Sequence, residues 1–372
     1  MTLEAASGLS GPGSGLTSFQ GKALGHFEYE QAGAERKHHF YASFLALAGT
    51  GPTEKILGDF LAASNIEGYR SVRLYAWWYE TEASEWSFRI GALLADDEFT
   101  GTNAGGNLCN SVFGWPVFIS ANTVNTGPAF FVAAPGLRLQ RSWGEKAAWR
   151  LGIYDGDTFD SPTGDGRSTR HGVHYRIGGN QGWFLISEVA FTPGSAATRV
   201  KLGGWLHTAD FADMQFDTNG LPLATTGGSP RQHSHNFGAY FTLEHTLAGT
   251  TGKAGDIESF LRMGAAPDDR NTIGWAIDTG VSWTGPIPSR PGDIAILGVA
   301  HAAFSRDFRT NARATSPTLP APDFETVVEA SYKLALSAKI FLQPDLQYIR
   351  HPGGSAAQRD ALLFMLRLNA SY

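Results

Sequence analysis

Long apolar runs are missing from this sequence of 372 residues. No stretch approaches the ~18 consecutive apolar residues that a transmembrane helix needs, so a membrane-spanning helix is excluded. The same absence leaves a membrane β-barrel open, because a barrel strand turns only every second side chain toward the lipid.

Cysteine and lysine are also scarce, and positive charges do not outnumber negative ones. Cys109 is the only cysteine, which excludes an internal disulfide and a cysteine metal cluster. Lys and Arg number 29 against 35 Asp and Glu, so the net charge is -6 and we expect no nucleic acid partner. Arginine supplies 21 of the 29 basic residues, and its planar fork of donors suits hydroxyl-rich ligands and aromatic ring faces.

Catalytic motifs are absent as well. The sequence contains no GxSxG, HExxH or GxGxxG motif and no Walker loop. His233 and His235 form a loop pair without a third metal ligand at a recognisable spacing, which indicates solvated side chains. Carboxylates on distant strands, such as Glu188 and Glu244, leave glycoside hydrolysis open. We expect a protein without catalytic residues, cofactor or bound metal.

Alternating apolar and polar side chains recur along the whole chain in segments of about ten residues. The closing segment, 361–372, has one apolar face, places Arg367 and Asn369 on the other, and stops on Tyr372. The other regular segments are 69–80, 86–91, 271–283, 325–337 and 339–348. Less regular ones are 22–30, 38–48, 136–143, 147–155, 170–178, 182–192, 198–209, 234–247, 256–265 and 293–305. They predict an all-β, transmembrane antiparallel β-barrel of about sixteen strands around a water-filled channel.

The predicted organisation is a flexible N-terminal segment over 1–20 and a single barrel domain over 21–372. The long connection 96–135 is the candidate for folding inward and narrowing the channel. Strands counted back from a periplasmic C-terminus place this connection on the periplasmic side, where turns are normally short. Residues 1–15 do not resemble a secretion signal, so we expect that an exported form has lost its signal peptide.

The polar faces of the predicted strands supply candidate pore-lining residues. Charged and amide groups bind sugar hydroxyls, and an aromatic ring packs on the weakly apolar face of a sugar ring. The candidates are Arg73, Trp77, Arg89, Gln343, Asp345, Gln347 and Arg367. Alternation alone is equally consistent with a general diffusion channel, in which these side chains contact water and do not select sugars.

The C-terminal part of the chain resembles a known family. Residues 341–354, FLQPDLQYIRHPGG, with Asp360 and the closing segment, closely resemble the end of the OprB-type carbohydrate-selective porins. Shorter motifs follow in the family's order: RLYAWWYE at 73–80, NSVFG at 110–114, PGLR at 135–138, GIYDGD at 152–157 and GWFLISE at 182–188. The resemblance implies a sixteen-stranded outer-membrane barrel that passes sugars down their gradient. It also implies charged residues at the narrow point, for which Arg73, Arg89 and Glu188 lie inside matching motifs.

The favoured interpretation is an outer-membrane porin for passive, carbohydrate-selective diffusion of mono- or small oligosaccharides. Its expected partners are small sugars, membrane lipid and lipopolysaccharide, and it is a monomer or a homotrimer. The alternatives are a soluble secreted all-β carbohydrate-binding protein or glycosidase, and a porin without sugar preference. A porin requires aromatic girdles around an outward apolar band, for which the candidates are Trp78, Trp86, Trp275, Trp283, Tyr332, Tyr348 and Tyr372.

Overall fold

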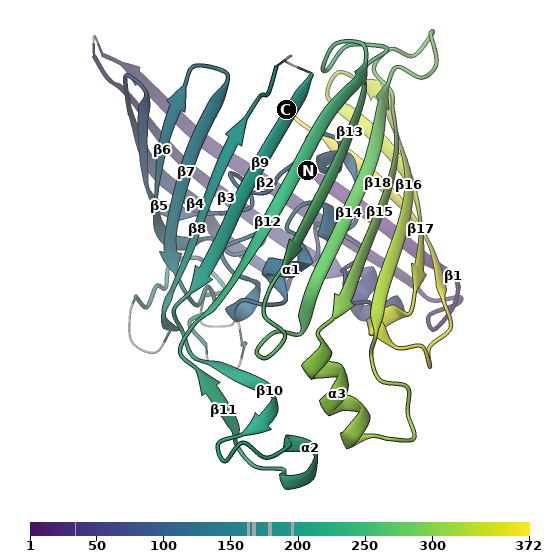
Figure 1. The fold of residues 1–372 in the computed structure, drawn as a ribbon. Coiled ribbons are helices and arrows are strands. Elements are labelled where there is room, and N and C mark those ends of the chain that lie inside the picture. The colour runs from purple at the N-terminus through teal and green to yellow at the C-terminus, as the bar shows by residue number, and fades with distance from the viewer. Residues whose placement is uncertain (34, 162–163, 166–168, 178–180, 195–196) are drawn as a thin grey trace.

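The computed structural model describes residues 1–372 except 34, 162–163, 166–168, 178–180 and 195–196. Within the described residues, sixteen antiparallel strands form a closed barrel (Figure 1). Strand β1 (Thr2–Ser10) pairs with β18 (Ala361–Ala370) on one side and with β2 (Thr17–Ala32) on the other, which closes the wall. The remaining barrel strands are β3 (Lys37–Thr50), β4 (Ser71–Ala83), β5 (Trp86–Leu93), β6 (Ala134–Trp143), β7 (Ala147–Asp155), β8 (Trp183–Phe191), β9 (Thr198–His207), β12 (Asn236–Ala248), β13 (Ile257–Ala265), β14 (Ile273–Thr284), β15 (Ile294–Phe304), β16 (Phe324–Ser337) and β17 (Ile340–Arg350).

The two ends of the barrel differ in the length of their connections. The end that carries both chain termini, called the terminal end below, has short turns such as 84–85 and 338–339. The opposite end, called the long-connection end, carries the long segments and the small helices. These helices are α1 (Val117–Ser120), α2 (Leu223–Thr226), α3 (Arg306–Thr315), a π-helical turn (Thr53–Leu57) and 3-10 turns at Gly105–Asn107, Ser111–Phe113, Val124–Thr126 and Pro352–Gly354.

Two sequence predictions about the strands are wrong. Residues 170–177 are turn and irregular structure rather than a strand, and residue 178 lies outside the described residues. Residues 2–10, which we expected to be part of a flexible segment, form β1. The missed strand β1 and the wrongly predicted strand at 170–178 leave the total at sixteen. Because strand directions were counted back from the C-terminus, the wrongly predicted strand reversed the predicted direction of every strand before it. The connection before β6 therefore lies at the long-connection end, not on the side of the short turns.

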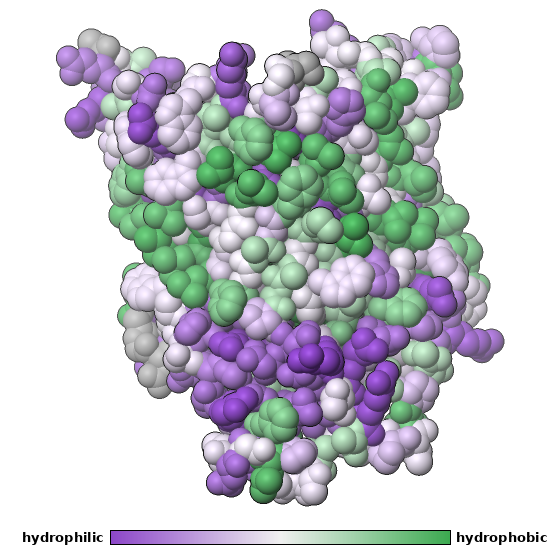
Figure 2. All heavy atoms as spheres, viewed as in Figure 1, coloured by the Kyte–Doolittle hydropathy of each residue, from purple (hydrophilic) through white to green (hydrophobic). Residues whose placement is uncertain are grey.

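The outer surface of the barrel carries an apolar band. Figure 2 shows one face, where hydrophobic residues gather over the strands and hydrophilic residues gather below them toward the long-connection end. Exposed aromatic side chains on the outside include Trp86, Trp275, Trp283 and Tyr348, as lipid contact at the membrane boundary requires. None of the described helices is long and apolar enough to span a membrane.

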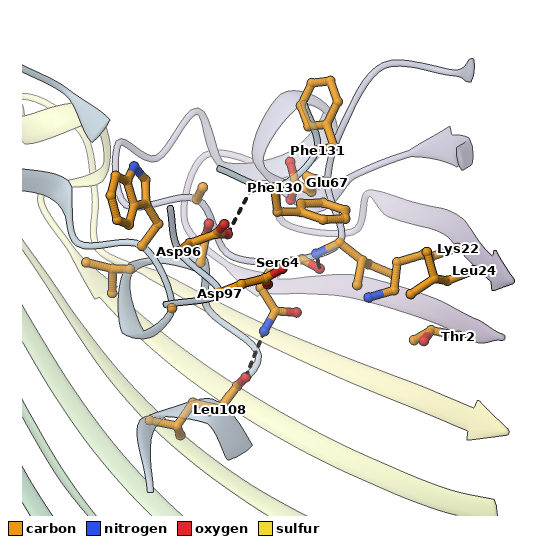
Figure 3. Close-up of a pocket in the computed structure, with 18 of the residues that line it drawn as sticks. Thr2, Lys22, Leu24, Ser64, Glu67, Asp96, Asp97, Leu108, Phe130 and Phe131 are labelled. Carbon is orange, nitrogen blue, oxygen red and sulfur yellow. Dashed lines mark hydrogen bonds between the residues drawn. The ribbon is translucent and has the colours of Figure 1, made fainter. Parts of the chain in front are cut away.

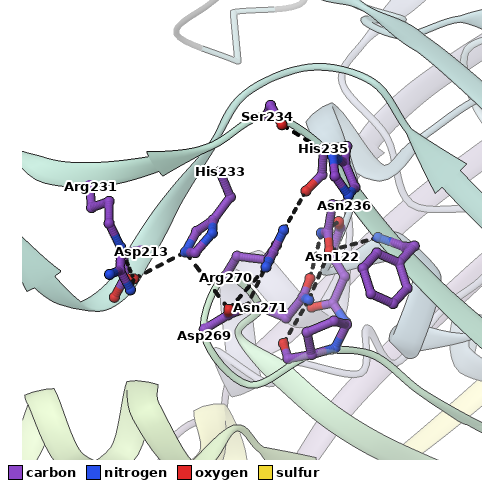
Figure 4. Close-up of polar contacts among 12 residues, drawn as sticks. Asn122, Asp213, Arg231, His233, Ser234, His235, Asn236, Asp269, Arg270 and Asn271 are labelled. Atoms are coloured by element: carbon purple, nitrogen blue, oxygen red, sulfur yellow. Dashed lines mark hydrogen bonds and ion pairs between the residues drawn. The ribbon is translucent and has the colours of Figure 1, made fainter.

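A small two-stranded sheet stands outside the barrel, formed by β10 (Phe211–Asp217) and β11 (Pro230–His233) between β9 and β12. Asp213 joins the two strands, since its Oδ2 lies 2.5 Å from Arg231 Nη2 and 3.0 Å from His233 Nε2 (Figure 4). Burial opposes ionisation of Asp213, but backbone N–H donors and Arg231 outweigh it and lower the pKa of this carboxyl. The next barrel hairpin fixes this sheet, because the N–H of Met214 donates to the Asp269 carbonyl at 2.8 Å.

Candidate functional site

The connection 94–133, called the inner loop below, folds into the barrel as predicted. Its side chains Phe99, Phe113 and Phe118 are fully buried. The ring of Phe118 lies 6.1 Å from that of Tyr240, and a Cβ at Gly264 on β13 would lie 2.5 Å from the Phe118 ring. The inner loop therefore packs directly on the inner face of β12 and β13.

Carboxylates of the wall hold the inner loop by its backbone. The Glu188 carboxylate accepts a hydrogen bond from the Thr100 N–H at 3.0 Å. On the opposite wall, Glu329 accepts from the N–H groups of Cys109 at 2.5 Å and Asn110 at 2.9 Å. A typical hydrogen bond contributes about 0.5–1.5 kcal/mol, so these three bonds together fix the path of the loop across the lumen.

Arg262 on β13 complements these carboxylates by binding backbone carbonyls. This side chain is fully buried and pairs with Asp278 on β14 at 3.0 Å. Its guanidinium also donates to the carbonyls of Thr100 at 3.0 Å, Val112 at 2.7 Å and Gly114 at 3.1 Å. One planar group thus gathers both limbs of the inner loop against the wall.

A cavity of about 900 Å³ remains between the inner loop and the strands at the barrel seam (Figure 3). Its wall combines strands β1 to β4 and β15 to β18 with the inner loop and the connection 58–70. The polar lining residues include Thr2, Lys22, Ser64, Asn65, Glu67, Asp96, Asp97, Ser111, Lys333, Gln343, Arg367 and Asn369, and the aromatic ones include Tyr41, Tyr75, Trp115, Phe130, Phe131 and Phe341. The cavity is therefore polar and aromatic together.

Acidic loop residues and Lys22 line this cavity together. Asp97 is solvent-exposed, and it lines the same cavity as Lys22 of β2 (Figure 3). The neighbouring Asp96 accepts the Phe130 N–H at 2.9 Å. Burial, reinforced by the charge of Asp97, raises the pKa of Asp96 to about 8. Burial likewise raises the pKa of Glu67 to about 8.

Stacked aromatic rings continue from the cavity along the wall. The Tyr41 ring, which lines the cavity, stacks on Trp78 with ring centres 5.1 Å apart and an angle of 14°. His26 stacks on the other side of Tyr41 at 5.7 Å and 20°. The Arg89 guanidinium lies over the Trp78 ring, 3.8 Å from its centre. These side chains form a flat apolar strip that ends in a cation.

Arg89 belongs to an ion cluster that joins the inner loop to the wall. Glu80 on β4 pairs with Arg89 and with Arg138 on β6, each at 2.6 Å. Glu98 of the inner loop pairs with the same two arginines, at 2.9 and 2.6 Å. The two arginines and the two glutamates thus balance each other's charge, and these ion pairs fix the orientation of the Arg89 guanidinium.

A β-bulge in β4 changes the position of the predicted residue Trp77. Ala42 pairs with Trp77 but Phe44 pairs with Leu74, so two residues of β4 oppose Ser43 alone. The extra residue shifts the alternation by one. Trp77 consequently lies on the outer face, and Trp78 enters the lumen instead of joining the outer girdle.

Arg73, located before the bulge, points inward as expected but is buried. Its guanidinium donates to the Phe131 carbonyl at 2.9 Å and to the Tyr69 hydroxyl at 2.5 Å. It also lies over the Tyr69 ring, 4.9 Å from its centre. Arg73 therefore positions the inner loop rather than facing the open cavity.

The predicted residues on β17 and β18 all point inward. Gln343 and Arg367 line the cavity. Gln343 donates to the Asn107 carbonyl at 3.0 Å, and Arg367 pairs with Glu4 of β1 at 2.8 Å. Gln347 donates to the Ala63 carbonyl at 2.9 Å, and it also donates to Asp345 at 3.0 Å. This part of the wall binds loop backbone with amide side chains.

Several lumen residues escaped the sequence analysis. Lys22 and Tyr41 lie on segments whose alternation was recognised, so their faces could have been assigned from it. Asp97 and Glu98 lie in the inner loop, where the sequence has no periodic pattern from which the direction of a side chain can be predicted. Trp78 was assigned to the wrong face because the bulge leaves no mark in the alternation of β4.

Comparisons with known proteins agree with this architecture. The family model described as "Carbohydrate-selective porin, OprB family" matches residues 26–372. Porin B of Pseudomonas aeruginosa is 22% identical over 239 residues, which are 60% of this chain and 51% of that protein, so the chain spans about half the length of this curated relative. The structure of OprB from Pseudomonas putida at high pH superimposes with a TM-score of 0.86 at 18% identity, covering 100% of this chain and 92% of that one. The outer membrane channel DcaP of Acinetobacter baumannii gives a TM-score of 0.61 at 10% identity, covering 100% and 95%.

The match to the family model covers nearly the whole chain and includes every motif on which the sequence resemblance depends. The likeness to solved porins independently supports the barrel fold. The closed barrel agrees with the porin description of the matching family. The chain therefore belongs to the OprB family of carbohydrate-selective porins, the β-barrel channels of the bacterial outer membrane.

Proposed function

We propose that this chain passes mono- or small oligosaccharides by passive diffusion through the cavity beside the inner loop. Water fills such a lumen, and a solute that crosses it must exchange its hydration for contacts with the wall. A sugar offers hydroxyl groups around a weakly apolar ring face. A lining that combines polar side chains with exposed aromatic rings matches both parts of that ligand.

The observation that carries the proposal is the stacked strip of Tyr41 and Trp78 beside the charged cavity. Tyr41, Lys22 and Asp97 line the same space, so one sugar can rest a ring face on the aromatic strip while its hydroxyls bind both charges. Arg89 covers the far end of the strip. Opposite charges in one narrow space favour a neutral, hydroxyl-rich solute over an ion of either sign.

The predicted pore-lining residues divide into two groups under this proposal. Gln343 and Arg367 bind the solute from the wall, and Arg89 does so beside Trp78. The other inward-facing candidates act indirectly, because they do not line the cavity and instead hold loop backbone or a neighbouring side chain. These positioning residues are Arg73, Glu188, Asp345 and Gln347. Trp77 lies outside the lumen and has no role in it.

The decisive experiment measures ion conductance through the purified protein in planar bilayers. Sugars that enter the constriction displace ions, so added glucose or maltose at millimolar levels should lower the conductance in a saturable manner. A protein that conducts without any sugar block is a general porin, which overturns the selectivity. A protein that does not conduct overturns the channel itself.

A further inference from the structure

The hairpin formed by β2 and β3 extends past the start of its neighbour β1. Strand β1 begins at Thr2, which pairs with Lys22, so in the described part of the chain residues 23–32 pair with β3 alone. The even-numbered side chains of β2 lie on the same face as Lys22, because alternate residues of a strand share a face. This face adjoins the mouth of the lumen at the terminal end.

Three possible metal ligands meet on this face. Glu30 pairs directly with His39 across the two strands, and Glu28 lies two residues before Glu30. His39 Nε2 lies 2.8 Å from Glu28 Oε1, and its Nδ1 lies 4.0 Å from Glu30 Oε1. One ligand atom from each side chain falls within 4.8 Å of the other two.

The ring of His39 is held in place with its Nε2 toward Glu28. His39 packs edge-on against Trp78, with ring centres 4.7 Å apart and an angle of 81°. Its Nε2 is shielded from solvent and lies 2.8 Å from Glu28 Oε1. A divalent cation would bind this nitrogen and the neighbouring carboxylates in place of a proton.

We propose that His39, Glu28 and Glu30 bind a divalent transition metal ion such as Zn²⁺ at the terminal mouth of the channel. One imidazole and two carboxylates are a ligand set that Zn²⁺ accepts, with water in the remaining position. Ligand atoms about 2.0–2.2 Å from the metal lie about 3.3 Å apart in a tetrahedron. The glutamates are exposed and can close that gap by rotating their side chains.

Nearby carboxylates do not compete for this role. Glu80 on β4 pairs with His39 from the other side in the strand register. It is already bound by two arginines, Arg89 and Arg138. A metal ion is therefore expected to use the exposed pair on β2.

The location of the site suggests an effect on transport, and this part of the inference rests on the proposed function. His39 contacts Trp78, which belongs to the aromatic strip. A bound divalent ion adds two positive charges at the mouth and restricts the ring beside the sugar path. We expect Zn²⁺ on the terminal side to lower the conductance and to weaken the sugar block.

The binding test uses the full chain in detergent, titrated with ZnCl₂ in a calorimeter. The chain contains eleven histidines, so the matched control is His38→Ala, which removes the adjacent histidine that faces the other way and contacts the Tyr79 hydroxyl. The wild type and the control should bind one equivalent with micromolar affinity. His39→Ala and the double variant E28Q/E30Q should bind at least about tenfold more weakly, as loss of a ligand predicts.

Two results would overturn the proposal: no Zn²⁺ binding by the wild type, or the same affinity in His39→Ala. Heat-modifiable migration on gels confirms that each variant is a folded barrel. Sugar block measured without Zn²⁺ tests the proposed transport function separately, since it does not depend on this metal site. Zn²⁺ binding without sugar block would leave the site standing and remove the sugar selectivity.

Discussion

The guanidinium carbon of Arg89 lies 3.8 Å from the centre of the Trp78 ring, inside the barrel lumen. A cation over an indole face at this distance stabilises the pair by about 0.5–2 kcal/mol. The ion pairs of Arg89 with Glu80 and Glu98 prevent the guanidinium from swinging away. The pair therefore presents an aromatic face and hydrogen-bond donors together.

Trp78→Ala should weaken the sugar block by about 3- to 30-fold, which corresponds to about 0.7–2 kcal/mol. The reason is the loss of a stacking surface that both Tyr41 and Arg89 contact. The measurement is the sugar concentration that halves conductance. Trp77→Ala is the matched control because its ring lies on the outer face, and equal effects of the two variants would contradict the assignment of Trp78 to the sugar path.

Glu329→Ala should release the inner loop. The N–H groups of Cys109 and Asn110 then lose their acceptor, at a cost of about 1–3 kcal/mol for each. Single-channel recordings should show larger and noisier currents, and limited proteolysis should cut the loop faster. Glu85→Ala, at an exposed turn, serves as the control. A quiet channel of unchanged conductance would show that Glu329 does not hold the loop.

Gly298→Val should disturb the packing of the same loop from β15. A Cβ at this position would lie 2.5 Å from Leu108 Cδ1 and 2.8 Å from Phe113 Cζ, so a larger side chain must displace the loop. Overpacking of this kind costs about 1–3 kcal/mol, and we expect a lower temperature of thermal unfolding. Gly25→Val, where a Cβ has no atom within 4 Å, should change little. Similar melting of both variants would disprove the close approach.

Ion selectivity should depend on pH. Because their pKa values are raised to about 8, Asp96 and Glu67 are largely protonated at about pH 6 and ionise as the pH rises toward about 9. The lumen gains negative charge over this range, so reversal potentials in a salt gradient should shift toward cation selectivity. Asp96→Asn should reduce the shift, and a shift of the same size in that variant would exclude Asp96 as its source.

Most of the barrel could be predicted from the sequence because lipid and water impose opposite demands on alternate residues. In β18 the exposed Phe364 and Leu366 and the inward Arg367 lie on the faces that alternation assigns to them. Strand β1 was missed because its small residues, such as Ala5 and Ser7, carry little contrast between faces. Its place in the wall is set by pairing with β2, the next strand in the sequence, and with β18 at the other end of the chain.

The family, the all-β class and the inward face of most strands follow from the sequence alone, since each of these depends on local alternation or on contiguous motifs. Which residues meet in the lumen depends on contacts between distant strands and loops. The bulge opposite Ser43 turned Trp78 inward, and Glu188, Arg262 and Glu329 fixed the inner loop from three separate strands. These contacts join residues that are far apart in the chain, and no local pattern records which backbone amide a distant carboxylate will accept.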